Sequence, residues 1–449
     1  MKTILMTIFS PFAARNILRP GFLDLLFSQT NCRLILIVPE TKQEFYRQQF
    51  ASQQNIIIEG IKSWRNPDGW LDRIFLSLSL HYVETETVKI LRRTWGKKFR
   101  PLFKVFKYLP VLRQLCRWLD WHLVVDKRPD SYLERYRPDL VIAAHAIYFE
   151  EQAFIREAKR RQIKTVSIIN SWDNLTVYKG VIRVLPDQLI VPNEIVQREA
   201  LDFCDLPASR VPIIGMWSCD HYFKSKPASR QTFCRALGLD PGKPFIIFAS
   251  IGHDYSDTEW EDIELIQKAI VTGQLPTDLQ ILIRSHPNPR SPFASGQLTP
   301  AANIFYQSSS TPLTTGEQDY EITPADDQAA LDAIYHSAVV VTIQSTISLE
   351  TAALDRPVIN INFDGWEKRG SDHPLSVKRY HHFTHYLPVH QSGGVYLAHS
   401  PEQLITGLAR YLKQPQTDQA ARQRLAKRLC WRLDGDASKR LAKLIVAEL

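Results

Sequence analysis

The chain has 449 residues, 44% of them hydrophobic and 23% charged, and its formal net charge is +8. No apolar run approaches the roughly 18 residues of a membrane span, and a basic pair, Arg15 and Arg19, follows the first apolar stretch, so neither a transmembrane helix nor a signal peptide is indicated. The six cysteines form no CxxC pair, so neither a disulfide framework nor a structural zinc site is indicated, and a reducing cytosol fits. At this length two domains are expected.

The first half of the chain alternates β-branched apolar runs with helical patterns, which predicts a doubly wound parallel sheet. Strands are expected at 2–9, 33–39, 55–59, 139–144, 164–170, 187–191 and 210–215, and helices at 20–28, 42–52, 149–161 and 194–204. The turn after the first strand has no glycine, so a Gly-rich dinucleotide fingerprint is absent and a Rossmann oxidoreductase is disfavoured.

Residues 62–136 interrupt this pattern and are expected to form a helical insertion. Within it, 91–119 contains nine basic residues and no acid, interleaved with aromatic residues. This composition suits a surface that lies on anionic lipid headgroups. The basic residues assigned to that membrane surface are Arg92, Arg93, Lys97, Lys98, Arg100, Lys104 and Lys107. The alternative is an amphipathic insertion that buries its aromatic rings and leaves its basic residues in water; nucleic acid is disfavoured because no nucleic-acid motif accompanies the segment.

The second half of the chain repeats the alternation of strands and helices. Strands are expected at 244–250, 280–284, 303–306, 338–343 and 357–362, and helices at 257–272, 328–337, 347–354, 401–413 and 418–449. We therefore predict an α/β protein with two Rossmann-like domains. The first is 1–223, the second is 231–449, and the polar stretch 224–230 links them, with the last helix packing back on the first domain.

The stretch 338–362 places hydroxyl side chains at the start of a helix between two buried strands. Ser345, Thr346 and Ser348 would lie where free backbone N–H groups and the helix dipole favour an anion. Glu350, one turn further, is placed to accept hydrogen bonds from a ribose. The alternative interpretation is that the hydroxyls only cap a structural helix.

Polar residues also follow other predicted strands. Arg284 and His286 come at the end of the strand 280–284, where a guanidinium pairs with a phosphate and an imidazole donates to it; the alternative is a surface ion pair and a structural hydrogen bond. His145 and Asp173 follow two strands of the first domain, and either is a candidate general base. Beside them, Trp172 and Asn174 are candidates for contact with the acceptor or sugar.

Three motifs carry a resemblance to known families. They are RSHP at 284–287, the run HSAVVVTIQSTISLETAALDRPVI at 336–359 and DGDASKRLAKLI at 434–445. In these the second domain resembles the donor half of two-domain GT-B glycosyltransferases of bacterial surface and capsular polysaccharide synthesis. It is similar to CDP-glycerol glycerophosphotransferases and to transferases that use CMP-activated sugars, and it shares a helix and an ending with UDP-N-acetylglucosamine 2-epimerases.

The resemblance implies a role for each residue of the second domain. Arg284 and His286 would contact the nucleotide phosphates, Ser345, Thr346 and Ser348 the phosphate end, and Glu350 the ribose. It implies a metal-independent glycosyltransferase without a cofactor, which moves a sugar or polyol phosphate from a nucleotide-activated donor to a glycan or lipid-linked acceptor. Such an enzyme would work in the cytoplasm, at the inner face of the plasma membrane, and would close about its interdomain linker.

Two other functional classes remain as alternatives. One is a nucleotide-sugar epimerase or hydrolase, which would turn over its substrate without an acceptor. The other is a non-catalytic nucleotide-binding or glycan-binding subunit, whose function would survive loss of both His145 and Asp173. The epimerases' signatures in the first domain are not matched at 145 or at 171–174, which favours transfer.

Overall fold

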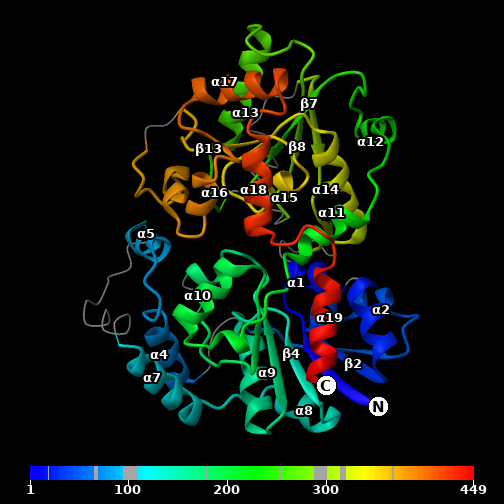
Figure 1. Ribbon diagram of the computed structural model, residues 1–449, viewed down its shortest axis with the longest axis vertical. Coiled ribbons are helices and arrows are strands. Elements are labelled where there is room, and N and C mark those ends of the chain that lie inside the picture. The colour runs from blue at the N-terminus through cyan, green and yellow to red at the C-terminus, as the bar shows by residue number, and fades with distance from the viewer. Residues whose placement is uncertain are drawn as a thin grey trace. The chain divides into compact units, whose positions relative to one another are not determined.

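The computed structural model describes residues 1–18, 20–64, 69–94, 109–177, 181–252, 254–287, 301–313, 320–366 and 369–449. The chain divides into two compact units, drawn as ribbons in Figure 1. Unit 1 comprises Met1–Lys89, Lys98–Ser218 and Asp436–Leu449, and unit 2 comprises Ile90–Lys97 and Cys219–Gly435. Each unit contains one six-stranded sheet with helices, which confirms the predicted α/β architecture of two Rossmann-like domains.

The sheet of unit 1 has the strand order β3-β2-β1-β4-β5-β6, and neighbouring strands are parallel. Its strands are β1 (Lys2–Thr7), β2 (Cys32–Pro39), β3 (Ile56–Ile61), β4 (Leu140–Ala143), β5 (Lys164–Ile168) and β6 (Gln188–Ile190). Ile4 of β1 pairs with Leu34 on one side and with Leu140 on the other, so β1 lies at the centre. Its apolar run does not alternate because helices cover both faces of the sheet.

The strand expected at 210–215 does not form. The chain makes one isolated parallel bridge there, between Val191 and Ile213. Pro212 has no N–H to donate, although its carbonyl accepts from the N–H of Val191 at 3.1 Å. A proline inside a short run removes one ladder hydrogen bond, so the run stays at the edge of the sheet.

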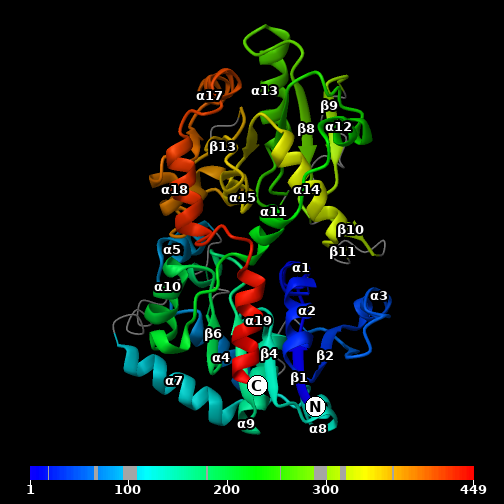
Figure 2. The ribbon, with the colours of Figure 1, turned by 45° about the vertical axis from the view of Figure 1, so that its right-hand side comes forward.

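The helices of unit 1 include one from the C-terminal end of the chain. They are α1 (Pro11–Ile17), α2 (Pro20–Gln29), α3 (Gln43–Gln49), α4 (Trp70–Ser79), α7 (Pro110–Leu123), α8 (Asp130–Tyr136), α9 (Phe149–Arg160), α10 (Glu194–Cys204) and α19 (Ala437–Glu448), with 3-10 turns η1 (Glu40–Lys42), η3 (Asn174–Thr176) and η5 (Ala208–Arg210). α5 (Glu86–Thr94) begins in unit 1 and ends in unit 2. α19 lies alongside α2 in both ribbon views (Figures 1 and 2), and its Leu441 and Ile445 join the apolar core of unit 1.

The sheet of unit 2 has the strand order β14-β13-β12-β7-β8-β9, again with parallel neighbours. Its strands are β7 (Phe245–Ala249), β8 (Gln280–Arg284), β9 (Ile304–Gln307), β12 (Val340–Thr342), β13 (Val358–Ile361) and β14 (Tyr396–Ala398), and a separate two-stranded hairpin pairs β10 (Thr311–Pro312) with β11 (Tyr320–Glu321). Val341 of β12 pairs with Phe248 of β7 and with Ile359 of β13, so the predicted strand–helix–strand stretch lies in the middle of this sheet.

In the second half of the chain, two expected helices differ from the prediction by more than two residues. The helices are α11 (Asp220–Lys224), α12 (Arg230–Leu237), α13 (Glu259–Val271), α14 (Pro324–His336), α15 (Ile347–Ala353), α16 (Leu387–Gln391), α17 (Pro401–Lys413) and α18 (Gln419–Leu429), with the 3-10 turn η8 (Val377–His382); η6 (Trp217–Cys219) spans the division. α14 begins earlier than expected because Thr323 and Asp326 form a capping box. The helix expected at 418–449 is two helices, since Trp431 and Gly435 adopt positive φ angles.

None of the helices in the described part of the chain combines the length and the apolar character needed to cross a bilayer.

Candidate functional site

In unit 2 the loops that follow β7, β8 and β12 lie at one edge of the sheet. These strands are neighbours in the order β12-β7-β8 and run parallel, so their carboxyl ends meet. Ligands of open α/β sheets bind beyond this edge. His286 follows β8, and Ser345 and Thr346 follow β12, so the structure brings these predicted donor residues to the same edge with one strand between them.

The imidazole of His286 packs against the loop that follows β7. Gly252 in that loop has a φ of +91°, and a Cβ at this position would lie 3.4 Å from Cγ of His286. Burial lowers the pKa of His286 to about 4, against the opposing effect of Asp254. The ring is therefore neutral near pH 7, and a neutral imidazole donates one hydrogen bond.

A buried carboxylate holds the β7 loop in place. Glu259, the first residue of α13, accepts from the hydroxyl of Ser250 at 2.6 Å and from the N–H of Ile251 at 2.8 Å. Burial raises the pKa of Glu259 to about 7, although these hydrogen bonds oppose the shift. Helix α13, which connects β7 to β8, thus fixes the loop against which His286 packs.

Arg284 is buried and its guanidinium is bonded within unit 2. One terminal nitrogen donates to Oε1 of Gln307 at 2.6 Å, and the other donates to the carbonyl of Asp326 at 3.3 Å. These partners lie at the end of β9 and in the first turn of α14. In this structure Arg284 ties β8 to two neighbouring elements, while His286 lies two residues further along the loop.

The hydroxyls at the start of α15 divide into two groups. Ser348 is fully buried; it donates to Oδ1 of Asn360 at 3.0 Å and accepts from the hydroxyl of Tyr386 at 3.1 Å. The same tyrosine oxygen accepts from the backbone N–H of Ser345 at 3.4 Å. Ser345 and Thr346 are partly exposed. Ser348 thus belongs to a network that fixes the loop, and the hydroxyls of Ser345 and Thr346 lie nearer to solvent.

Glu350 is also buried in this region. Its Oε2 accepts a hydrogen bond of 2.7 Å from the hydroxyl of Tyr222 in α11. Glu350, which lies one turn into α15, therefore also contacts helix α11.

In unit 1, His145 lies just beyond β4 and is buried. Its backbone N–H donates to Oε2 of Glu151 at 2.7 Å, and the same oxygen accepts from the hydroxyl of Thr7 at 3.1 Å. The imidazole meets the ring of Tyr148 edge-on, with 4.6 Å between centroids. Burial raises the pKa of Glu151 well above its usual range. This glutamate of α9 fixes the position from which His145 projects.

The predicted residues of the loop after β5 close a turn. Asp173 accepts from the hydroxyl of Ser171, and Oδ1 of Asn174 accepts from the N–H of Ser171 at 3.0 Å. Trp172 and Asn174 are buried, whereas Asp173 is partly exposed. Because β4 and β5 are parallel neighbours, this loop and His145 share the carboxyl edge of the sheet.

Glu199 on α10 is a candidate that sequence reasoning missed. α10 packs against η3, directly after Asp173. The Oε2 atom of Glu199 is buried and has no hydrogen-bond partner among the described residues. Burial, together with the charges of Asp173 and Asp202, raises the pKa of Glu199 to about 8. The available signal was an acid three residues after Val196, on the buried side of an amphipathic helix.

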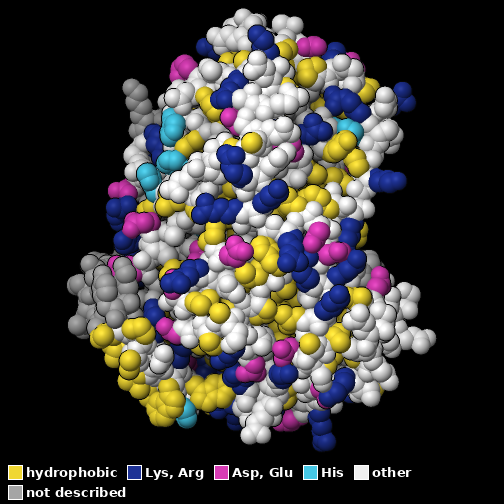
Figure 3. Space-filling view, viewed as in Figure 1, with side chains coloured by type: hydrophobic (Ala, Val, Ile, Leu, Met, Phe, Trp, Pro, Cys, Tyr) yellow, Lys and Arg dark blue, Asp and Glu magenta, His cyan; other side chains and the backbone are white. Residues whose placement is uncertain are grey.

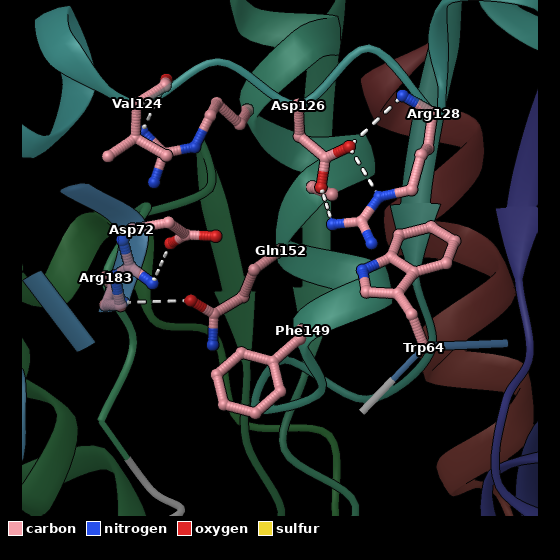
Figure 4. A pocket seen from close by; sticks show the side chains of 10 residues that line it. Trp64, Asp72, Val124, Asp126, Arg128, Phe149, Gln152 and Arg183 are labelled. Atoms are coloured by element: carbon pink, nitrogen blue, oxygen red, sulfur yellow. Dashed lines mark hydrogen bonds and ion pairs between the residues drawn. The ribbon is translucent and has the colours of Figure 1, made fainter. Parts of the chain in front are cut away.

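A small cavity of about 30 Å³ in unit 1 lies beside the insertion (Figure 4). Its walls include Trp64, Asp72, Val124, Asp126, Arg128, Phe149, Gln152, Arg156 and Arg183. Arg183 reaches Asp72 at 2.6 Å, and Arg128 is paired with Asp126 while lying 3.9 Å from the ring centroid of Trp64. The cavity is lined by matched charges, and its size suits ordered water rather than a substrate.

The basic segment is only partly described. Lys97, Lys98, Arg100, Lys104 and Lys107 lie outside the described residues. Arg92 and Arg93 lie in the last turn of α5, and Arg93 lies 3.7 Å from Asp372 with most of its side chain exposed. Among the described residues, no group of three or more His, Cys, Asp and Glu side chains is arranged to hold a metal ion.

The comparisons with known proteins agree with this architecture. Residues 183–447 match the family described as CDP-Glycerol:Poly(glycerophosphate) glycerophosphotransferase. The chain belongs to this glycerophosphotransferase family. The match includes the whole of Cys219–Gly435, and with it every donor residue predicted in unit 2. A member of this family is a transferase. No curated protein matches the chain.

Solved structures share the fold of this glycerophosphotransferase-family protein. UDP-GlcNAc 2-epimerase from Neisseria meningitidis, bound to UDP-GlcNAc, is 13% identical with a TM-score of 0.55, covering 99% of this chain and 100% of that chain. The enzyme of the same name from Methanocaldococcus jannaschii is 12% identical with a TM-score of 0.54, covering 100% of both chains. The glycotransferase of kitacinnamycin is 11% identical with a TM-score of 0.51, covering 100% and 99%. These similarities confirm the GT-B-like fold.

Proposed function

We propose that this protein transfers a sugar or a polyol phosphate from a nucleotide-activated donor to a hydroxyl of a cell-surface glycan or a lipid-linked acceptor. The observation that carries the proposal is the family match over 183–447, which spans the unit with the predicted donor residues. The shared sheet edge of His286, Ser345 and Thr346 supports it, because donors from two loops meet where a diphosphate would bind.

In the proposed donor complex, His286, Ser345 and Thr346 donate hydrogen bonds to phosphate oxygens. The neutral imidazole supplies one N–H, and the two hydroxyls supply the others. Glu259, Tyr386 and Arg284 position the loops that carry these donors. In that arrangement Ser348 holds the loop through its hydrogen bonds to Asn360 and Tyr386. Glu350 is the remaining candidate for contact with the ribose.

The transfer step has two forms, which depend on the donor. With a polyol phosphate donor, the acceptor oxygen forms a bond to the β-phosphorus and the nucleoside monophosphate leaves with the electron pair of the broken P–O bond. With a sugar donor, the acceptor oxygen attacks the anomeric carbon and the bond from that carbon to the phosphate oxygen breaks. A nucleoside diphosphate leaves from a nucleoside-diphosphate sugar, and CMP leaves from a CMP-activated sugar. In both, His145 or Asp173 takes the hydroxyl proton, and the phosphate donors stabilise the charge that develops on the leaving group. We propose that Trp172 and Asn174 contact the acceptor or the transferred group.

Ligand screening tests the donor site. The purified protein is heated with CMP, CDP, UDP and GDP, and then with their glycerol and sugar derivatives; we expect a cytidine nucleotide to raise Tm most, in keeping with the family. The double variant Ser345→Ala/Thr346→Ala should lose this shift. The control Ser392→Ala, at the end of α16, should keep it. An unaltered shift in the double variant would remove the proposed phosphate site.

Turnover separates transfer from the other classes. Released nucleotide is measured with and without a glycan or glycerophosphate acceptor, and in the presence of EDTA. We expect release that needs the acceptor and survives EDTA. Release without any acceptor would instead indicate an epimerase or hydrolase. A variant His145→Ala/Asp173→Asn that binds donor but does not transfer supports catalysis by these residues, and undiminished transfer would place the base elsewhere. Donor binding without any transfer by the wild-type protein would indicate a binding subunit.

A further inference from the structure

Helix α7 in the insertion buries charged side chains and exposes several apolar ones. Arg113, Arg117 and Asp120 are buried, although they are charged. Val111 and Trp118 are exposed, with relative exposures of 72% and 56%. An ordinary surface helix places its apolar stripe inward and its charges in water. The exposed apolar side of α7 therefore calls for a physical explanation.

The inward charges of α7 are all paired. Arg113 and Arg117 each reach the carboxylate of Asp205 at 2.6 Å. Asp120 accepts from Arg156 at 2.8 Å and from Nε of Arg183, also at 2.8 Å. Buried charges are tolerated only when they are matched in this way. These pairs anchor α7 to α9 and α10 and fix which of its sides faces outward.

The outward side of α7 carries an apolar stripe. Val111, Leu115 and Trp118 recur at intervals of four and three residues, which places them on one side of the helix. Gln114 and His122 share this exposed side, and Asp120, the one acid of the helix, is buried. The His122 ring lies 4.3 Å from the Trp118 ring between centroids. No acid therefore interrupts the stripe.

Helix α4 extends this surface. It packs beside α7, where Leu78 of α4 and Leu112 of α7 join the same apolar cluster. On its own outer side, Trp70 is 70% exposed and Ile74 is also exposed. We call Trp70, Ile74, Val111, Leu115, Trp118 and Leu123 the α4–α7 face. Figure 3 shows hydrophobic side chains gathered at the lower left, where Figure 1 labels α4 and α7.

The charge of the neighbouring sequence indicates what covers this face. The sequence that leads into α7 contains Lys97, Lys98, Arg100, Lys104 and Lys107, and no acid occurs from 91 to 119. A second copy of the chain would bring the same positive charge to such an interface and be repelled. An anionic lipid leaflet offers negative headgroups for the basic residues and an acyl layer for the apolar stripe, and tryptophan prefers the boundary between them.

We propose that the α4–α7 face docks on the surface of an anionic lipid bilayer, with α7 lying in the plane of the headgroups. This inference refines the expected membrane surface: the apolar contact is made by α4 and α7, and the arginines 113 and 117 of the basic segment serve inside the protein instead. It does not depend on the proposed transfer reaction, because it concerns a surface of unit 1 and not the donor residues of unit 2.

The test is sedimentation of the full chain with vesicles. The triple variant Val111→Gln/Leu115→Gln/Trp118→Gln is compared with a control, Val271→Gln/Tyr306→Gln, which alters exposed apolar residues of unit 2. On vesicles of phosphatidylcholine mixed with phosphatidylglycerol we expect wild type and control to bind, and the triple variant to bind at least about tenfold more weakly. Unchanged Tm and circular dichroism show that the triple variant is folded, since it alters only exposed side chains.

Three further results complete the test. On vesicles of phosphatidylcholine alone, or at raised salt, wild-type binding should fall, since the basic residues need anionic headgroups. Equal binding of the triple variant and wild type would overturn the proposal. So would light scattering that finds a dimer which the triple variant dissociates, because the face would then be covered by a second copy.

Discussion

The backbone N–H of His145 and the carboxylate of Glu151 are joined by a buried 2.7 Å hydrogen bond. Unit 2 has an equivalent hydrogen bond, in which Glu259 of α13 accepts from the N–H of Ile251 at 2.8 Å. In each unit a glutamate in the first turn of a crossing helix thus holds a loop at the carboxyl edge of the sheet. A carboxylate is suited to this place because the positive end of the helix lies beside it.

Replacing Glu259 tests this positioning role. Glu259→Ala leaves the N–H of Ile251 buried without its acceptor, so we expect the free energy of unfolding to fall by about 1–3 kcal/mol. Nucleotide binding should weaken as well, because the loop that supports His286 is released. Glu259→Gln keeps an acceptor oxygen and should retain most of both properties. Urea unfolding and nucleotide titration measure the two effects, and equal behaviour of Ala and Gln variants would contradict the role.

Glu199 predicts a pH dependence of stability. Its pKa is about 8 in the folded protein against an ordinary value of 4.5, so the folded state binds the proton more tightly than the unfolded state does. The associated stability is complete below about pH 4.5 and is lost as the pH rises through about 8. Glu199→Gln should therefore flatten this dependence and stabilise the protein near pH 8. Glu194→Gln, an exposed change on the same helix, should leave the profile of unfolding against pH unaltered.

His286 predicts a loss of nucleotide affinity. If its neutral imidazole donates to a phosphate, removing the side chain costs one hydrogen bond to a charged group, about 1.5–3 kcal/mol or roughly tenfold or more in Kd. His286→Ala should show this loss in calorimetric titration at neutral pH. The exposed His373→Ala serves as the control and should bind as wild type. Normal affinity in His286→Ala would place the phosphates elsewhere.

The anchor of α7 predicts a large loss of stability. Asp205→Asn removes the charge that Arg113 and Arg117 share, and Asn still suits the positive φ of 58° at this position. Two buried guanidinium groups then face one another without a counter-ion, so we expect a loss of about 3–5 kcal/mol in urea unfolding. Asp202→Asn breaks the exposed pair with Arg198 on the same helix and should cost under about 1 kcal/mol.

The sequence by itself determined the two parallel sheets and the edge at which the polar loops gather. Runs such as 338–343 and 357–362 lack polar alternation, because both faces of a parallel strand are covered, and this pattern is local. Parallel strands joined by crossover connections all end at the same edge of their sheet, so the position of His286 and Ser345 at one sheet edge was predictable. The proline at 212 and the turn at 431–435 carried local signals of the two breaks that the prediction missed.

Only the tertiary structure decided which polar side chains are bonded to other residues of the protein and which face solvent. Arg284 and Ser348 look like ligands in the sequence, yet Gln307 and Asn360 bind them, from strands that are adjacent only after folding. Arg113 and Arg117 look like surface charges, yet Asp205 binds both. Such pairs join residues 12 to 92 positions apart, and no local pattern records them. The energy of a buried charge depends on its partner, and its partner is set by the packing of distant elements.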